Sequence, residues 1–181
     1  AGTIKVSANN NLGTGNLIFN GGTLNTADSF SLTGRSRVYL DGNATFNVDS
    51  STTLTVLTTI TARSGSATFT KSGAGTLVLS SANNRWYGGT NINAGSIQLA
   101  ANNTLGGAAV YLANAAGVQL DLNNYNAAVG AISGGGTDGG NIILGSGNLT
   151  VTQTQDTTYD GVISGTGALT INGHKTLSLT R

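Results

Sequence analysis

The sequence predicts an all-β fold of one particular class, the right-handed parallel β-helix, with two to three short strands in each coil. Three observations support this class. Apolar and polar residues alternate over short stretches, clusters of Gly, Asn, Ser and Asp interrupt these stretches, and a long segment of sequence occurs twice. A single continuous solenoid over residues 1–181 accounts for all three observations.

Short strands with one buried face are predicted wherever this alternation is regular. Helical spacing of apolar residues is not sustained anywhere in the chain, so no crossover helices are expected. The alternating apolar sets are Ile4/Val6, Leu17/Phe19, Val38/Leu40, Leu77/Leu79, Ile97/Leu99, Val118/Leu120/Leu122, Leu149/Val151, Leu169/Ile171 and Leu177/Leu179.

Corners are predicted at the polar and Gly clusters, which recur about every 8 to 12 residues. Asn tolerates left-handed backbone conformations, and Gly fits where a side chain has no room. The Asn pairs are Asn9/Asn10, Asn83/Asn84, Asn102/Asn103 and Asn123/Asn124.

A β-sandwich and a closed barrel are the alternatives to a solenoid. Sandwiches protect their exposed strand edges with Pro and charged residues, but this chain has no Pro and only 8% charged residues. A membrane barrel needs strands of about 9 to 11 residues and two aromatic girdles, but the apolar runs here are mostly shorter and aromatic residues are only 6%. In a solenoid each coil covers the edges of its neighbours, and Thr, Ser and Asn form ladders where stacked like charges would repel.

The charge distribution and the lack of Cys exclude several classes of function. The eight Lys and Arg residues are scattered and the net charge is +1, so no nucleic-acid partner is expected. No apolar run approaches the roughly 20 residues of a membrane helix, so direct membrane insertion is not expected. The absence of Cys excludes disulfides and fits either a reducing compartment or a secreted protein that crosses a membrane unfolded.

An internal repeat divides the chain into long units. Residues 2–13 return as residues 95–106, an offset of about 93 residues, and residues 72–79 return as residues 164–171, an offset of about 92 residues. The chain is therefore expected to hold about two copies of a unit of roughly 93 residues, and to start and stop partway through them.

Residues 73–99 carry the most distinctive motif. It consists of a Gly-x-Gly strand opening, an Asn and an aromatic residue before a Gly-Gly-Thr turn, and a closing Gly-x-Ile-x-Leu. This motif closely resembles the passenger-associated transport repeat, or autotransporter-associated β-strand repeat, of autotransporter passenger domains. The residues given a structural role by the resemblance are Gly73, Gly75, Leu77, Leu79, Asn83, Tyr87, Gly89, Thr90, Ile92, Gly95, Ile97 and Leu99.

The resemblance implies a structural, non-enzymatic segment of a passenger that is exported through the periplasm and outer membrane to the bacterial surface or secreted. Its implied partner is its own C-terminal translocator barrel, outside these residues, with host-cell surfaces or neighbouring passengers as further candidates. The expected function is a scaffold that aids secretion and supports surface adhesion or self-association. The alternatives are an inert stalk for an enzyme or toxin domain elsewhere in the parent chain and, ranked last, a carbohydrate-active β-helix enzyme.

No catalytic, cofactor or metal site is expected from the titratable residues. His174 is the only histidine and has no evident metal or nucleophile partner. Asp156 and Asp160 are close in sequence and are expected to form turns, not a glycosidase pair. Residues 134–140 faintly resemble a calcium-binding nonapeptide, but a single copy cannot stack on itself, so a flexible loop is expected.

Aromatic and Thr residues also have structural explanations. Trp86 and Tyr87 are expected to cover a corner of the core and not to dock sugars. The Thr-rich runs at residues 52–55, 58–61 and 150–154 are irregularly spaced, so ladders on a solvated face are expected in preference to an ice-binding surface.

Overall fold

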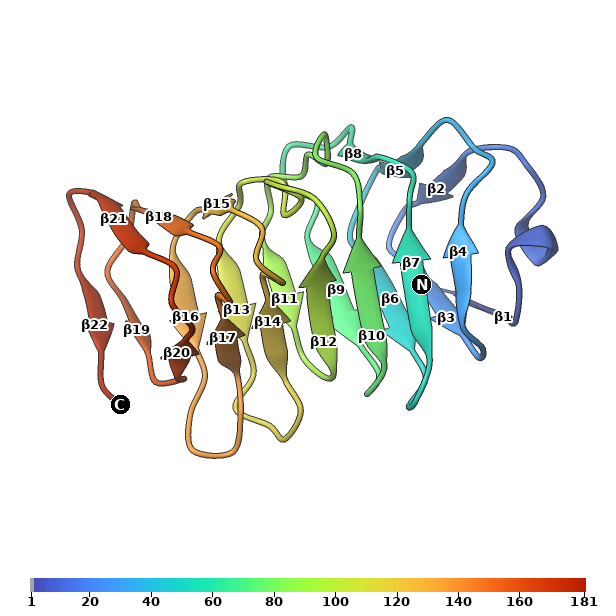
Figure 1. Cartoon of the computed structure of the whole chain (residues 1–181). Coiled ribbons are helices and arrows are strands. Elements are labelled where there is room, and N and C mark those ends of the chain that lie inside the picture. The colour runs from blue at the N-terminus through green and yellow to red at the C-terminus, as the bar shows by residue number, and fades with distance from the viewer. Residues whose placement is uncertain (1) are drawn as a thin grey trace.

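The chain winds into a parallel β-helix whose coils advance along one axis (Figure 1). This computed structural model describes residues 2–181. Every strand pair in that range is parallel. The strands nearest the viewer run upward and those behind run downward as the chain advances from right to left, so the winding is right-handed. The prediction of a right-handed parallel β-helix is confirmed.

Each coil visits the same faces in the same order, which builds long sheets from strands that are distant in sequence. A nine-stranded sheet and a seven-stranded sheet run along the molecule, and two three-stranded sheets lie on what we call the third face. The nine-stranded sheet contains β1 Thr3–Val6, β3 Thr23–Thr26, β6 Ala44–Val48, β9 Phe69–Ser72, β11 Thr90–Ile92, β13 Val110–Leu112, β16 Ile132–Gly134, β19 Thr157–Tyr159 and β22 Leu177–Leu179.

The other sheets complete each coil. The seven-stranded sheet contains β4 Phe30–Leu32, β7 Thr53–Val56, β10 Thr76–Leu79, β12 Ser96–Leu99, β14 Gln119–Asp121, β17 Asn141–Ile143 and β20 Ile163–Ser164. The third face contains β2 Leu17–Phe19, β5 Val38–Leu40 and β8 Ile60–Ala62, and then β15 Ala127–Val129, β18 Leu149–Gln153 and β21 Leu169–Gly173.

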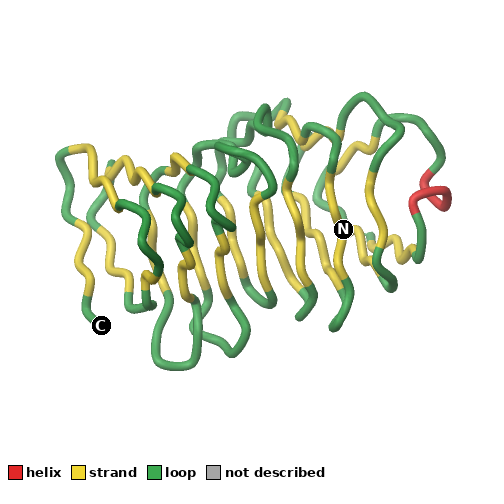
Figure 2. Tube along the Cα trace, viewed as in Figure 1, coloured by secondary structure: helices red, strands yellow, loops and turns green. Residues whose placement is uncertain are grey.

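Within residues 2–181, helical structure is limited to one short segment. The 3-10 helix η1, Asn9–Leu12, lies in the first coil and is the red segment of Figure 2. Within the part of the chain that the structure describes, no helix has the length and apolar character needed to cross a membrane.

Coil length varies along the molecule. Thr76 is in register with Ser96, 20 residues later, and Asn47 is in register with Ser72, 25 residues later. Strands therefore stay short and aligned while the corners absorb the difference. The arrangement in about two copies of a roughly 93-residue unit stays a prediction.

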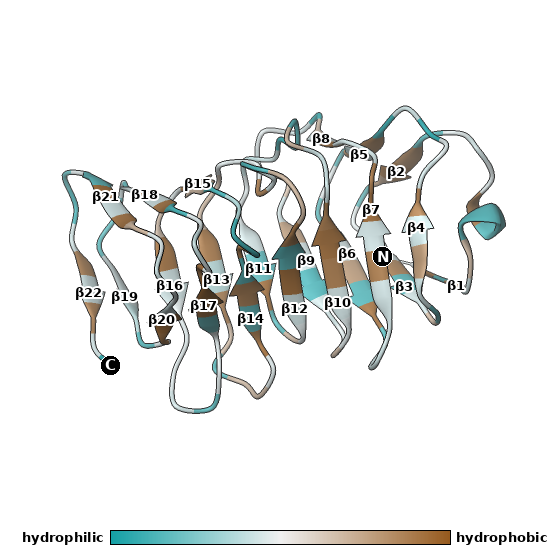
Figure 3. Ribbon diagram, viewed as in Figure 1, coloured by the Kyte–Doolittle hydropathy of each residue, from teal (hydrophilic) through white to brown (hydrophobic). Residues whose placement is uncertain are grey.

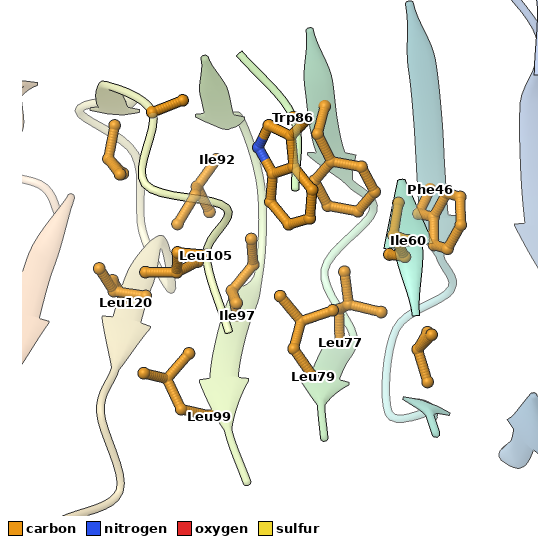
Figure 4. Packing of buried hydrophobic residues seen from close by; sticks show 14 of the residues in the cluster. Phe46, Ile60, Leu77, Leu79, Trp86, Ile92, Ile97, Leu99, Leu105 and Leu120 are labelled. Carbon is orange, nitrogen blue, oxygen red and sulfur yellow. The ribbon is translucent and has the colours of Figure 1, made fainter. Parts of the chain in front are cut away.

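The core consists of inward side chains stacked in columns between the sheets (Figure 4). Leu54, Leu77, Ile97, Leu120 and Ile142 are in register along the seven-stranded sheet and are all fully buried. Burying one such side chain contributes about 1.5 to 3 kcal/mol. The alternation of apolar and polar positions that predicted the strands is visible along them in Figure 3.

A second column is aromatic. Phe19, Phe46, Phe69 and Trp86 follow one another, with ring centroids 5.3, 5.1 and 4.9 Å apart. Each ring belongs to a different coil, so the stack ties four successive coils together at the separations that aromatic pairs favour.

Outward positions of the nine-stranded sheet form an uncharged polar column. Thr23, Thr45, Thr70 and Asn91 are in register, and the column continues to Tyr111. Equivalent residues in a parallel sheet are about 4.8 Å apart, so charges of one sign here would repel along the whole column. We call this surface the polar wall.

Candidate functional site: the repeat coil

The segment with the family motif, residues 73–99, lies in the middle of the solenoid and contains three strands, β10, β11 and β12. It makes one full turn, from β10 to β12 in the same sheet. We call this segment the repeat coil. Its strands β10 and β12 are neighbours in the seven-stranded sheet, and β11 lies in the nine-stranded sheet. Among the predicted motif residues, the fully buried ones are Leu77, Leu79, Thr90, Ile92, Ile97 and Leu99.

The corner between β9 and β10 brings adjacent backbones very close together. Gly73 has a φ of +71°, and a Cβ atom added there would lie 2.2 Å from the Val48 carbonyl oxygen. A Cβ atom on Gly75 would lie 2.2 Å from the Asp49 carbonyl oxygen. Gly95 occupies the next coil and has the same relation to the Gly75 oxygen, at 2.3 Å. These contacts explain why the motif places Gly at this corner in successive coils.

Asn84 joins the repeat coil to both of its neighbours. Its side-chain Oδ1 accepts a hydrogen bond from the backbone N–H of Ile60 in the preceding coil, at 2.8 Å. Its Nδ2 donates to the backbone carbonyl of Thr104 in the following coil, also at 2.8 Å. The third face has only the bridge between Thr61 and Arg85 here, so the Asn84 amide adds to the two backbone bonds that Arg85 makes with Ile60 and Ala62.

The two aromatic residues of the motif have different environments. Trp86 is fully buried, and its Nε1 donates a hydrogen bond to Oγ1 of buried Thr90 at 2.8 Å. Tyr87, the next residue, is 57% exposed. Asn83 is also exposed, while its neighbour Asn84 is buried. The structural roles assigned to Asn83 and Tyr87 by resemblance stay predictions, and the adjacent Asn84 and Trp86 make the buried contacts.

Lys71 lies in the core beside the motif, where a charged residue is rare. It is fully buried, and it occupies an inward position between Phe46 and Ile92 of the adjacent coils. Its Nζ donates to the carbonyl oxygens of Ser72 at 2.7 Å, Gly73 at 2.6 Å and Ala94 at 3.0 Å. Burial lowers the pKa of Lys71 to about 8.

Lys71 thus holds the glycine corner from inside and reaches across to the next coil. Sequence reasoning did not identify Lys71, because a single lysine does not mark a site in the alternation of apolar and polar residues. A signal was present, since Lys71 is two residues after Phe69 and so shares the inward face of the strand.

A polar cluster lies next to this corner. Asn25 donates from Nδ2 to Asp49 Oδ1 at 2.7 Å, and Lys5 Nζ lies 3.1 Å from Asp49 Oδ2. The hydrogen bond from Asn25, followed by that from Lys5, lowers the pKa of the Asp49 carboxyl. Ser72 completes the cluster through a 3.1 Å hydrogen bond to Asn47. The cluster links four coils along the outer surface.

The other residues considered for chemistry lie apart from the repeat coil. His174 is exposed. Asp156 accepts a hydrogen bond from the Thr176 backbone at 2.8 Å, and Asp160 is exposed on the other side of β19. Asp138, in the glycine-rich loop, donates its backbone N–H to Asn114 Oδ1 at 2.8 Å. Within residues 2–181 no group of three His, Cys, Asp or Glu side chains that could hold a metal ion occurs.

Comparison with known proteins agrees with the motif. Residues 69–99 match the family model described as passenger-associated transport repeat. The chain is 36% identical over 168 residues to the adhesin BmaC autotransporter of Brucella suis biovar 1 (strain 1330). The matched region is 91% of this chain but 5% of that adhesin, and no solved structure matches. The resemblance to autotransporter passengers is confirmed, and it implies a surface-exposed or secreted protein exported through the outer membrane.

Proposed function

Because this chain carries a passenger-associated transport repeat and is similar along most of its length to part of an autotransporter adhesin, we propose that it is a non-catalytic scaffold segment whose repeat coil promotes secretion. The observation that supports this role is the bonding of the repeat coil to both neighbours. Asn84 bridges the preceding and following coils, and Lys71 bonds to carbonyl groups of two successive corners.

Stacking of coils provides a physical route from these bonds to secretion. The stability of a solenoid is approximately a sum of terms for each coil and for each contact between neighbours. A coil with extra bonds on both sides therefore forms a favourable contact as soon as an adjacent coil is available. For a chain that emerges unfolded from a translocator, such a coil biases movement outward, because each stacked coil opposes return through the pore.

Deleting the residues of one coil tests this proposal. Removing residues 76–95 brings Ser96 into the position of Thr76, so the solenoid loses one coil and keeps its register. The matched control removes residues 24–45, which brings Phe46 into the position of Leu24. In the parent passenger, the first deletion is expected to lower the amount of protein at the cell surface severalfold relative to the control. Equal surface amounts for the two deletions would contradict the proposal.

The polar wall supports a second role, in adhesion or self-association. It presents hydroxyl and amide groups in register over successive coils, from Thr23 to Asn91. Single contacts of this kind are weak, but a repeated array gains strength when several engage at once. The adhesin named above is a relative of which this chain covers a small part, so adhesion by this segment is part of the proposal.

Beads coated with the chain test the second role. We expect clumping or cell binding that decreases when Thr45 and Thr70 are both replaced by Lys, because two like charges would stand about 4.8 Å apart on each wall. Beads coated with a Thr152→Lys variant, which changes an exposed residue of β18 outside the wall, are the control. An inert stalk would give no clumping with any of these beads.

Two other candidate functions concern the parent protein. A catalytic or toxin domain elsewhere in the parent chain would make this segment a stalk, and reading the parent sequence upstream and downstream decides this. A carbohydrate-active enzyme would need converging carboxylates in a cleft. The two acidic residues that are closest in sequence, Asp156 and Asp160, lie at opposite ends of β19. The carboxylate of Asp156 faces Lys175, with the charged atoms 4.0 Å apart.

A further inference from the structure

Arginine residues that are scattered in the sequence gather on the third face near β5 and β8. Arg37 directly precedes β5, and Arg85 forms the bridge with Thr61 of β8. Arg63 also lies here, but its guanidinium is paired with both oxygens of Asp41 at 2.6 Å and lies 4.4 Å from the centre of the Tyr39 ring. Its charge is therefore already compensated.

Arg37 and Arg85 differ from Arg63 in this respect. Both residues are exposed, and within residues 2–181 neither guanidinium takes part in an ion pair or a side-chain hydrogen bond. Val38, the residue after Arg37, is in register with Ile60 of β8, and Thr61 of β8 is in register with Arg85. The two arginines therefore lie on opposite sides of β8. A coil spacing of about 4.8 Å places their backbones roughly two spacings apart along the solenoid.

A cleft of about 300 Å³ lies between these two arginines. We call it the arginine cleft. Besides the arginines, the residues that line it are Thr59, Thr61, Ala82, Asn83 and Asn84, none of which carries a carboxylate. The lining thus combines two cationic forks with hydroxyl and amide groups that donate and accept hydrogen bonds.

We propose that the arginine cleft binds an anionic saccharide, a sulfated or carboxylated unit of a polysaccharide. Arginine forks bind planar or tetrahedral oxyanions through paired hydrogen bonds, and Thr and Asn side chains bind sugar hydroxyls. The cleft has no aromatic lining on which nucleobases could stack, and Ala82 is the only apolar residue in it, which is too little for a peptide anchor.

The proposal rests on the adhesive part of the proposed function for its biological meaning, but it concerns a different surface. The arginine cleft is on the third face, and the polar wall is on the nine-stranded sheet. Loss of saccharide binding with bead clumping intact, or the reverse, therefore separates the two. Secretion does not enter this test.

Binding of the 181-residue chain to immobilised heparin, measured by surface plasmon resonance, tests the cleft. Arg37→Gln and Arg85→Gln are each expected to weaken the apparent affinity about tenfold, and the double variant more. Arg85→Lys keeps the charge but loses the fork, and it is expected to fall between wild type and Arg85→Gln. Lys175→Gln is the matched control, because it removes one positive charge far from the cleft.

The outcomes separate a saccharide site from general attraction between charges. Heparin binding that decreases after removal of its sulfates identifies a sulfate-preferring site, and unchanged binding identifies a carboxylate-preferring one; both support the proposal. Equal weakening by Lys175→Gln and Arg85→Gln, equal affinity for single-stranded DNA, or no effect of the double variant would each overturn it. Circular dichroism and the midpoint of thermal unfolding verify that the exposed substitutions leave the fold intact.

Discussion

The indole nitrogen of Trp86 donates a hydrogen bond of 2.8 Å to Oγ1 of Thr90, and both residues are fully buried. The bond connects the end of the third face with the start of β11, across the Gly-Gly-Thr turn of the motif. It gives this Thr a role that a β-branched apolar residue cannot fill, because a buried indole N–H without a partner is unfavourable.

Thr90→Val is expected to lower the free energy of unfolding by about 1 to 3 kcal/mol, since it leaves the Trp86 N–H buried without an acceptor. Thr90→Ser retains the hydroxyl and is the control; it loses one methyl group. Urea unfolding followed by tryptophan fluorescence reports on both variants, because the chain has one Trp. If Val and Ser variants are equally stable, the hydrogen bond has no structural role.

Asn84→Ala is expected to cost about 2 to 4 kcal/mol, because the Ile60 N–H and the Thr104 carbonyl would both lose their partner. The control is Asn83→Ala, an exposed neighbour for which a change within about 0.5 kcal/mol is expected. The same urea experiment compares them. A larger effect at Asn83 than at Asn84 would show that the motif asparagine, and not the buried one, maintains the coil.

Gly75→Ala is expected to destabilise the chain by at least about 2 kcal/mol, because the added methyl would meet the Asp49 carbonyl oxygen at 2.2 Å, where only backbone can move. Gly65→Ala is the matched control, since nothing lies within 4 Å of its added Cβ and neither glycine has a positive φ. Gly65→Ala is expected to be neutral or stabilising by up to about 1 kcal/mol. Equal thermal midpoints for the two variants would contradict the close-approach explanation.

Lys71 makes stability depend on pH. Its pKa falls from 10.5 in the unfolded chain to about 8 in the folded one, so between these values the unfolded state binds more protons than the folded state. The free energy of unfolding of wild type relative to Lys71→Met is therefore expected to be constant below pH 8 and to rise between pH 8 and 10.5, by about 3 kcal/mol at most.

Urea unfolding at several pH values between 7 and 10.5 measures this difference. The comparison with Lys71→Met removes the contribution of tyrosines and other lysines, which titrate in both proteins. A difference that stays flat over this range, or falls as the pH rises, would mean that the folded protein does not depress the pKa of Lys71.

The sequence predicted the fold class and many of the buried positions for one physical reason. Period-two alternation reports which face of a strand is covered, and Leu77/Leu79 and Ile97/Leu99 are indeed fully buried. The long repeat and the absence of edge-protecting residues then favoured a solenoid over a sandwich, and the parallel sheets confirm that choice.

What the sequence did not predict depends on register between coils. Since coil length varies between 20 and 25 residues at the pairs described above, residues that stack cannot be found by counting at a fixed interval. This is why scattered arginines gave no sign of the arginine cleft. It is also why Asn84, whose partners lie in adjacent coils, carried no local signal, and why the inward position that Lys71 shares with Phe69 did not identify the carbonyl groups it bonds to.

The bonds of Asn84 and Lys71 are expected to fix the repeat coil more firmly to its neighbours than the other coils are fixed to theirs. Native-state hydrogen exchange of the 181-residue chain, measured by mass spectrometry, tests this expectation. We expect the backbone amides of β10, β11 and β12 to exchange most slowly, and slow exchange there to be lost in Asn84→Ala. Faster exchange in these strands than in β5, β6 and β7 of the preceding coils would contradict this expectation.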